Sequence, residues 1–242
     1  MDTRQTNEEI HREILMWQRK VVSTNARKGA LIELIEDYHG YEKGVRDVLV
    51  ANRSGSLSGI CGVVAELFNV AEEYDTAIES VLGNALQHIV TETEGCARAA
   101  ISYLKLRNLG RAAFLPLDRI CRKPIAESAK QKASKINGYR GLAIDLISFE
   151  PKYQEIFYYL LGNVIIADNL SSADNISIKV SQQYRIVTLE GDLINNNGLV
   201  EGGSLTPLKD LLGRKRQISD LETDILKSEE KIKALTVRLQ DK

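Results

Sequence analysis

The sequence predicts a mixed α/β (α+β) protein, in which two homologous half-domains are flanked by two helices that form an antiparallel coiled coil. Three observations predict this fold: a long internal repeat, an alternation of strand-like and helix-like segments, and a heptad pattern at each end. The chain has 242 residues, 43% of them hydrophobic and 27% charged. These values are typical of a globular protein with one large or two small domains.

The internal repeat consists of five landmarks that recur with one spacing. The first copy reads Gly59-x-x-Gly62, Glu66-Leu67, Tyr74, Gly83-Asn84. The second copy follows 79 residues later without a gap and reads Gly138-x-x-Gly141, Asp145-Leu146, Tyr153, Gly162-Asn163. After a shift of a few residues, the hydrophobic runs 111–118 and 185–192 also match. Several landmarks in one register indicate a tandem duplication.

Each end of the chain carries a seam of residues spaced alternately four and three apart, which is typical of a coiled-coil helix. The N-terminal seam is Ile10, Ile14, Trp17, Val21, Thr24, Lys28, Leu31, Ile35, Tyr38. The C-terminal seam is Leu211, Arg214, Ile218, Leu221, Ile225, Ser228, Ile232, Leu235, Leu239. Because one arm enters the body and the other leaves it, we expect an antiparallel pair; two independent surface helices are the alternative.

Glycines and polar stretches predict the boundaries between the parts. His39-Gly40 and Gly44 interrupt the first arm, and residues 52–58 form turns. The expected parts are an N-terminal arm (1–40), a first half-domain (41–117), a basic linker (118–137), a second half-domain (138–205) and a C-terminal arm (206–242).

Each half-domain is predicted to run strand, helix, strand, helix, strand. In the first half these elements are expected at 60–65, 71–82, 87–91, 95–108 and 112–115. In the second half they are expected at 142–147, 153–161, 164–167, 171–181 and 185–189. The second half adds a hairpin over 192–204 with a turn at Asn197-Gly198, and residues 125–135 of the linker are expected to be partly helical.

The net charge of −1 conceals a strongly basic segment. Residues 98–140 contain eleven lysines and arginines against only two acidic residues, a net charge of +9. Such a segment favours salt-dependent contact with nucleic acid; a solvated face neutralised by the acidic arms is the alternative. The candidate DNA-binding residues here are Lys105, Arg107, Arg122, Lys123. A second basic cluster at the arm junction contains Lys209, Arg214, Lys215, Arg216.

A search for catalytic chemistry finds no convincing site. The phosphate-binding motif G-x-x-x-x-G-K-[ST] is absent, and Gly55-x-x-x-Gly59-x-x-Gly62 precedes a predicted strand, where its amides would not lie at a helix N-terminus. The three histidines and three cysteines form no catalytic or metal-binding set. We therefore expect no enzymatic activity, cofactor or metal in these residues, and the odd cysteine number suits a reducing cytosol.

Gly202-Gly203 ends the last predicted strand, where glycine stabilises little by packing. One interpretation is an exit turn in the left-handed region; the other is a site where a second backbone comes close. A strand left at the edge of a duplicated sheet can pair with another chain. Dimerisation through sheet edges is thus the leading mechanical hypothesis.

Taken together, several motifs resemble the hinge of a structural maintenance of chromosomes (SMC) protein. In chain order, between two coiled coils, they are Gly40-Tyr41-Glu42-Lys43-Gly44-Val45-Arg46, Gly59-Ile60-Cys61-Gly62-Val63-Val64-Ala65-Glu66-Leu67, Gly110-Arg111-Ala112-Ala113-Phe114-Leu115-Pro116-Leu117, Thr188-Leu189-Glu190-Gly191-Asp192, Gly202-Gly203-Ser204. The resemblance covers the body from about Gly40 to Ser204 and both arms. Leu211-Leu212-Gly213-Arg214 is similar to the bacterial form.

This resemblance implies a ring-shaped homodimer in which the first half-domain of one chain meets the second half-domain of the other. The residues implied at that contact are Gly198, Gly202, Gly203, Arg111, Ala113, Leu115. Two features depart from the family: Asn197-Gly198 stands where many members have two glycines, and Leu205-Thr206-Pro207-Leu208 stands where lysines are common. The second departure shifts the expected DNA contact to the cluster Lys209, Arg214, Lys215, Arg216.

The family resemblance also implies a role in joining two long arms so that DNA is entrapped, with weak, salt-dependent DNA binding. It implies ATP hydrolysis in distant head domains, with kleisin-type and accessory subunits bound to those heads, and a cytoplasmic, nucleoid-associated location without membrane contact. The alternatives are an α/β enzyme with a helical dimerisation hairpin and a coiled-coil adaptor that recruits a partner helix.

Overall fold

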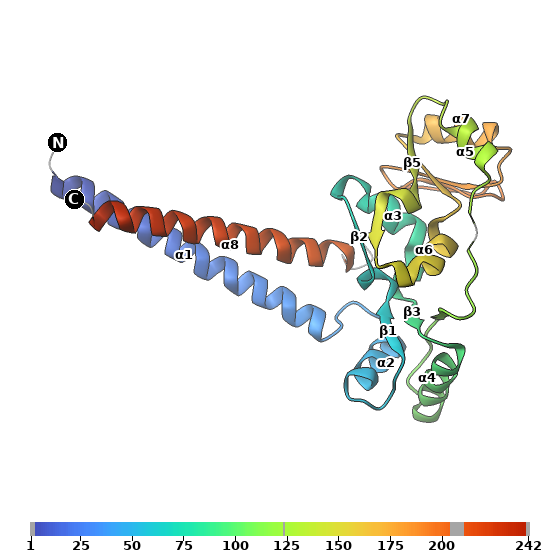
Figure 1. Ribbon diagram of the computed structural model, residues 1–242, viewed down its shortest axis with the longest axis horizontal. Coiled ribbons are helices and arrows are strands. Elements are labelled where there is room, and N and C mark those ends of the chain that lie inside the picture. Colours follow the sequence, from blue (N-terminus) through green and yellow to red (C-terminus); the bar gives the residue numbers. More distant parts are fainter. Residues whose placement is uncertain (1–2, 123, 204–210, 241–242) are drawn as a thin grey trace. The chain divides into compact units, whose positions relative to one another are not determined.

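The computed structural model describes residues 3–122, 124–203 and 211–240 (Figure 1). The chain divides into two compact units. One unit lies within residues 1–39 and 213–242 and contains the two long helices; the other comprises residues 40–212.

The helical unit is a pair of antiparallel helices, α1 (Thr3–Glu36) and α8 (Leu211–Gln240), which lie side by side in Figure 1. All predicted seam residues whose burial is described are buried or half-buried. Lys28 Nζ lies 3.5 Å from Glu222 Oε1, so a polar seam position is paired across the two helices. The predicted coiled-coil pair is confirmed, because the apolar stripe of each arm finds its burial against the other.

The 40–212 unit contains short helices and three sheets. Its helices are α2 (Lys43–Arg53), α3 (Asp75–Leu82), α4 (Glu94–Arg107), α5 (Glu127–Ala133), α6 (Gln154–Leu161), α7 (Leu170–Lys179). Its strands are β1 (Ile60–Val63), β2 (Phe68–Val70), β3 (Ile89–Thr91), β4 (Phe114–Pro116), β5 (Tyr139–Leu142), β6 (Ile147–Phe149), β7 (Val164–Ala167), β8 (Arg185–Thr188), β9 (Leu193–Ile194), β10 (Val200–Glu201). The sheets have the orders β1-β3-β4, β10-β9-β8-β7-β5 and β2-β6.

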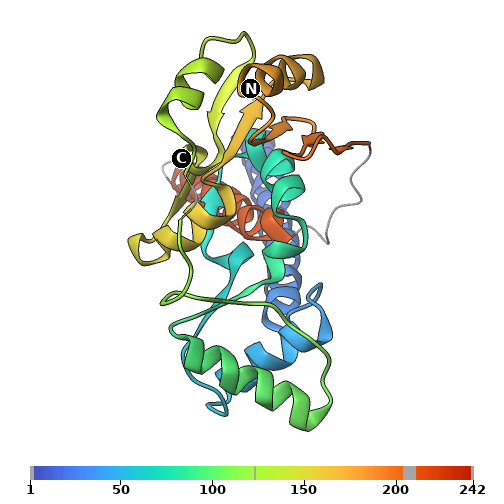
Figure 2. The same ribbon diagram turned by 90° about the vertical axis from the view of Figure 1, so that its right-hand side faces the viewer.

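The predicted duplication appears as two matching sheets. β3 pairs antiparallel with β1 and parallel with β4, and β7 pairs in the same way with β5 and β8. β1 and β5 carry the same register shift, before Gly62 and before Gly141. Helix α2 packs on α4 as α5 packs on α7, and Figure 2 shows α4 (green) and α7 (orange) at opposite ends of the unit. The repeat therefore begins with a helix in both halves.

The repeated glycines Gly59 and Gly138 have the same structural role. Their φ angles are +72° and +87°, in the left-handed region that favours glycine. A Cβ at Gly59 would overlap the thiol of Cys96, and one at Gly138 would overlap the hydroxyl of Ser172. Each glycine thus lets the first turn of a helix, α4 or α7, approach its sheet closely.

A two-stranded ribbon that we did not predict joins the halves. In the β2–β6 pair, Phe68 lies opposite Phe149, Asn69 opposite Ser148 and Val70 opposite Ile147. The central residues Asn69 and Ser148 are 79 positions apart, so the ribbon relates the two copies by an approximate twofold axis.

One buried core extends over both halves. The ring centroid of Phe157 lies 5.4 Å from that of Phe68 and 4.7 Å from that of Phe149. Such contacts add to the hydrophobic stabilisation of the joined halves.

Three local predictions need correction. The strand expected at 142–147 is instead β5, then a 3₁₀ turn (Ala143–Leu146), then β6, because one hydrophobic run covers all three elements. Gly44 does not interrupt a helix, as was expected for the first arm, but lies in the first turn of the next helix, α2. The match of run 111–118 to run 185–192 is wrong by two residues, since the sheet register makes Phe114 equivalent to Ile186.

After α7 the backbone makes a left-handed turn that glycine would adopt more easily. Ser181 and Gln182 have φ angles of 59° and 55°. A side chain in this region costs about 1 kcal/mol. We expect Gln182→Gly to raise the free energy of unfolding by about 0.5–1 kcal/mol in urea melts. The neighbouring Gln183→Gly, at ordinary φ, should lower it; equal effects of the two variants would contradict this explanation.

Candidate functional site

Each sheet ends in two edge strands, and in the two larger sheets β4 and β10 are the edge strands opposite to β1 and β5. β4 is the last strand of the three-stranded sheet, and β10 is the last strand of the five-stranded sheet. The duplication makes β8 the counterpart of β4, and the outer edge of β8 is covered by β9. The first half has no such hairpin, so its equivalent edge stays uncovered within the described chain.

The hydrogen bonds of β4 define which backbone groups face outward. The amide of Ile89 donates to Ala113 O, and the amide of Leu117 donates to Thr91 O, both at 2.9 Å. Since backbone groups alternate along a strand, the N–H and C=O of Phe114 point away from β3. Pro116, which has no N–H to offer, also faces this outer edge, as is usual for proline in sheets.

The same analysis of β10 identifies its outward groups. The amide of Asn195 donates to Leu199 O at 2.8 Å, and Val200 lies opposite Ile194 in β9. The backbone of Leu199 therefore faces β9, whereas the N–H and C=O of Val200 and of Gly202 face outward. The side chains of Leu199 and Val200 are both 53% exposed, so this edge is apolar as well as unpaired in its sheet.

At each of the three hairpin glycines, the backbone conformation or the packing of the same chain favours glycine. Gly198 and Gly203 have φ angles of +83° and +115°. At Gly202 a Cβ would overlap a carboxylate oxygen of Asp192. Gly203 therefore has the positive φ that the exit-turn interpretation requires, and Gly202 also places its backbone on the open edge. The predicted hairpin with its Asn-Gly turn is confirmed.

The other residues expected at a contact lie in or next to β4. Arg111 and Ala113 are exposed, whereas the side chain of Leu115 is buried in the core of its own chain. Leu115 thus supports the strand from inside, and the edge of β4 presents mainly backbone.

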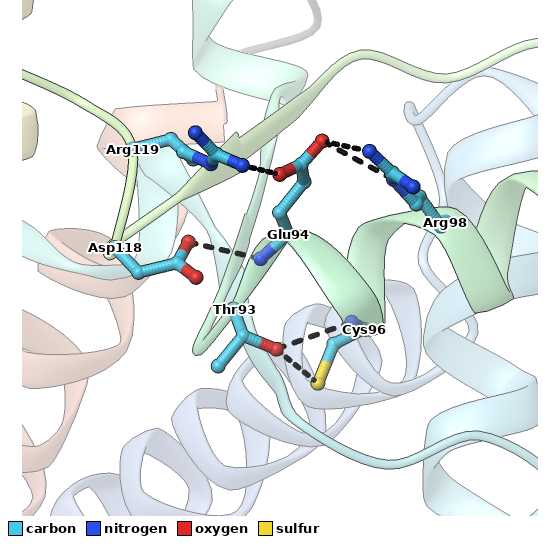
Figure 3. Close-up of polar contacts among 6 residues, drawn as sticks. All are labelled: Thr93, Glu94, Cys96, Arg98, Asp118 and Arg119. Atoms are coloured by element: carbon cyan, nitrogen blue, oxygen red, sulfur yellow. Dashed lines mark hydrogen bonds and ion pairs between the residues drawn. The ribbon is translucent and has the colours of Figure 1, made fainter.

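Both ends of β4 are held by helices. At its entry, a Cβ on Gly44 of α2 would lie 2.8 Å from the carbonyl carbon of Arg111, so only glycine lets the two backbones come this close. At its exit, the amide of Glu94, the first residue of α4, donates to Asp118 Oδ1 at 2.9 Å (Figure 3). Arg119 Nη2 lies 2.5 Å from Glu94 Oε2.

Arg185 is a structurally important residue that sequence reasoning missed. Its Nη2 donates to Leu160 O at 2.5 Å, and its Nη1 donates to Val81 O at 3.5 Å. Val81 and Leu160 are duplicates, 79 residues apart, in the last turns of α3 and α6. One guanidinium therefore satisfies carbonyls at two helix C-termini, one from each half. Burial lowers the pKa of the Arg185 guanidinium from its ordinary value.

A cavity of about 320 Å³ lies beside this arginine. Its described lining is Val81, Leu82, Ala85, Tyr159, Leu160, Asn163, Arg185, Asn196. This lining contains no carboxylate, imidazole, thiol or aliphatic hydroxyl, so it lacks the usual acids, bases and nucleophiles.

Other sites of chemistry were also sought in the described parts of the chain. Within residues 3–122, 124–203 and 211–240, no three His, Cys, Asp or Glu side chains gather as metal ligands would. Among the described helices, none combines the length and the hydropathy that a bilayer crossing requires. The duplicated acids Glu66 and Asp145 orient local structure: Glu66 accepts from Tyr41 Oη at 3.2 Å, and Asp145 from Lys130 Nζ at 3.2 Å.

Comparison with known proteins assigns the family. The model of the family described as SMC proteins Flexible Hinge Domain matches residues 57–177, half of the chain. The chain belongs to the SMC hinge family.

Similar hinges exist among curated and solved proteins. The chain is 38% identical over 212 residues to the chromosome partition protein Smc of Bacillus subtilis, and 40% identical over 216 residues to that of Desulfitobacterium hafniense. These alignments cover 87% and 88% of this chain but only 18% of each relative, so the chain spans under a fifth of their length.

The fold matches as well. A crystal structure of an asymmetric dimer of the Geobacillus stearothermophilus SMC hinge domain superposes with a TM-score of 0.91 at 34% identity. The superposition covers 98% of this chain and 95% of the Geobacillus stearothermophilus chain. The Pyrococcus furiosus SMC hinge gives a TM-score of 0.56 at 30% identity, covering 80% and 90%.

Five of the eleven cations in the basic segment of this hinge form ion pairs within the 40–212 unit. Its ion pairs with carboxylates from outside the segment are Arg98–Glu94, Arg119–Glu94, Arg122–Glu155, Lys130–Asp145, Arg140–Asp168. Hydrogen bonds from Arg98 and Arg119 lower the pKa of the Glu94 carboxyl, and one from Arg122 lowers that of Glu155. Acids of the same unit thus offset part of the charge of this segment.

The individual DNA-binding candidates of the hinge lie in different places. Lys105 and Arg107 are exposed in the last turn of α4, with the Arg107 guanidinium 4.7 Å from the ring centre of Tyr103. Arg122 pairs with Glu155, and Arg214 donates to His39 O. Arg216 is half-buried in α8. Outside the described residues or side chains lie Lys123, Lys209, Lys215.

Proposed function

We propose that this chain is the dimerisation hinge of a bacterial chromosome-organising SMC protein, and that it joins two coiled-coil arms so that DNA is entrapped. The two complementary open edges, β4 in one half and β10 in the other, carry this proposal. Two copies related by a twofold axis would pair each β4 with the partner's β10. The dimer then contains two such contacts, and neither β4 nor β10 is left open to a third chain. The solved relative from Geobacillus stearothermophilus is a hinge dimer, and the curated relatives are chromosome partition proteins.

The duplication suggests the direction of the partner strand, and the outward backbone groups suggest its register. β9 covers β8 in an antiparallel manner, and β8 is the counterpart of β4. By analogy, β10 of the partner runs antiparallel to β4. We place Phe114 of one subunit opposite Val200 of the other, because both residues point their N–H and C=O groups outward. The outward N–H and C=O groups of these two residues then bond to each other. In this register Gly202 lies opposite Ala112, and Pro116 lies opposite Gly198, whose N–H is already bonded to Asn195 O.

Gel filtration with light scattering tests the association, and a disulfide tests the register. We expect a dimer at micromolar concentration that buries about 1,200–2,000 Å² in total. In a background with Cys121→Ser, the pair Ala113→Cys and Glu201→Cys should cross-link two chains on mild oxidation. These positions form a non-hydrogen-bonded pair with Cα atoms about 4.5 Å apart. The pair Ala113→Cys and Leu199→Cys, two residues out of register, is the control; a monomer would refute the association, and preferential cross-linking of the control would refute the register.

We also propose that weak DNA contact in this hinge involves the exposed end of α4. Lys105 and Arg107 support it, because both are exposed cations and Arg107 lies beside the Tyr103 ring, an arrangement that suits phosphate contact and base stacking. A titration at two salt concentrations tests it. Binding at low salt should weaken with added salt and in the Lys105→Gln/Arg107→Gln double variant, and an absence of binding at low salt would refute the proposal.

A further inference from the structure

We infer that Glu94 is a positioning residue that holds the open edge of β4 ready for a partner strand. The inference rests on the proposed dimerisation and concerns a residue outside the strand itself. It is carried by the contacts of Glu94 and by a difference between the two halves.

Glu94 joins the first turn of α4 to the turn that leaves β4. Its carboxylate accepts from Arg98 Nη2 at 2.7 Å and lies 2.5 Å from Arg119 Nη2, while its amide donates to Asp118 Oδ1 (Figure 3). The amide of Arg119 in turn donates to Pro116 O at 3.1 Å, at the end of β4. Backbone and side chain of one residue thus fix the direction in which the chain leaves the strand.

The second half has no equivalent clamp among its described residues. The positions equivalent to Glu94 and Asp118 are Leu170, which is 40% exposed, and Glu190. There the chain instead turns back into β9: the amide of Thr188 donates to Asp192 O at 2.9 Å, and β9 covers β8. The clamp therefore occurs in the half whose terminal strand is left uncovered.

A short uncovered strand needs such support before it can bind. β4 has three residues and is bonded to a neighbouring strand on one side. If its end were free to move, a partner strand would have to order it during binding, and this ordering would reduce affinity. Glu94 removes part of that cost by fixing the exit of β4 in the free subunit.

The test replaces Glu94 by the residue of the other half. In the full chain, we expect Glu94→Leu to raise the dimer dissociation constant about five-fold in sedimentation experiments, with little change in melting temperature. Asp145→Asn, which removes an exposed ion pair with Lys130 in the second half, should leave the dissociation constant unchanged. Because the clamp acts as a unit, adding Arg119→Leu to Glu94→Leu should weaken dimerisation no further. An unchanged dissociation constant in Glu94→Leu would overturn the inference.

A second readout keeps this test separate from the dimer proposal. Val200→Pro removes an outward N–H and should give a monomer without loss of the β9 pairing. In that monomer we expect Glu94→Leu to accelerate hydrogen exchange at the Leu117 amide, and the Asp145→Asn control to leave it unchanged. Unchanged exchange would refute the positioning role. If the wild-type chain proved monomeric, the proposed dimerisation would fail, and faster exchange would still support the clamp.

Discussion

Replacing Arg185 by methionine is expected to lower the free energy of unfolding by about 2–3 kcal/mol. The substitution keeps the aliphatic volume but leaves the carbonyls of Val81 and Leu160 without their donor at two helix C-termini. The loss should exceed that of an ordinary arginine, because the two carbonyls belong to different halves of the unit. Urea denaturation of the purified chain measures it.

Arg122→Met is the matched control for this experiment. Arg122 pairs with Glu155 on the surface, and exposed ion pairs of this kind contribute little to the free energy of unfolding. If Arg185→Met and Arg122→Met lowered the free energy of unfolding equally, the contact of Arg185 with the ends of two helices would contribute no more than an exposed ion pair. Arg185 also lines the cavity, so its replacement changes the cavity as well as the hydrogen bonds. The variant Ala85→Met separates the two effects, because it should fill space in the cavity and leave the contacts of Arg185 with the two carbonyls in place.

Gly44→Ala should destabilise the chain by about 2 kcal/mol although alanine is the better helix former. Gly44 lies in the first turn of α2, and a methyl group there would overlap the backbone carbonyl of Arg111, just before β4. Backbone cannot rotate away as the end of a flexible side chain can, so the helix or the strand must move. Because β4 is the proposed dimer edge, dimerisation should weaken together with stability.

Gly29→Ala provides the opposite expectation. Gly29 is a helical glycine of α1, and beyond the backbone of its own helix no described atom lies within 4 Å of the point that a Cβ would occupy. Alanine should therefore stabilise α1 by about 0.5–1 kcal/mol, through helix propensity alone. Thermal melts of both variants decide the matter: stabilisation by Gly44→Ala would show that the contact with Arg111 yields easily.

Periodic features were predictable because their signal lies within a short stretch of sequence. The seams of α1 and α8 follow from heptad spacing, and the duplication follows from landmarks such as Gly59 and Gly138. The hairpin at Asn197-Gly198 follows from turn chemistry. In each case, residues a few positions apart, or one constant spacing, contain the information.

Charge was a poorer guide than periodicity. The segment 98–140 has a net charge of +9 by composition. In the folded chain four of the eleven cations form ion pairs with carboxylates that are distant in sequence, as Arg122 does with Glu155 and Arg140 with Asp168. Composition counts charges, but folding determines which of them remain available to a partner.

By itself, the sequence determined the two coiled-coil arms, the doubled α/β body and the family to which the chain belongs. Only the tertiary structure decided that β2 and β6 join the halves, that Arg185 serves two helices, and that the clamp at Glu94 stands beside the uncovered strand. The physical reason is that a sequence pattern does not show which distant residues come into contact. The 79-residue spacing indicates the repeat but not the pairing of β2 with β6, and the partners of Arg185 and Glu94 follow no repeat spacing. They become neighbours only when the duplicated halves pack around one core.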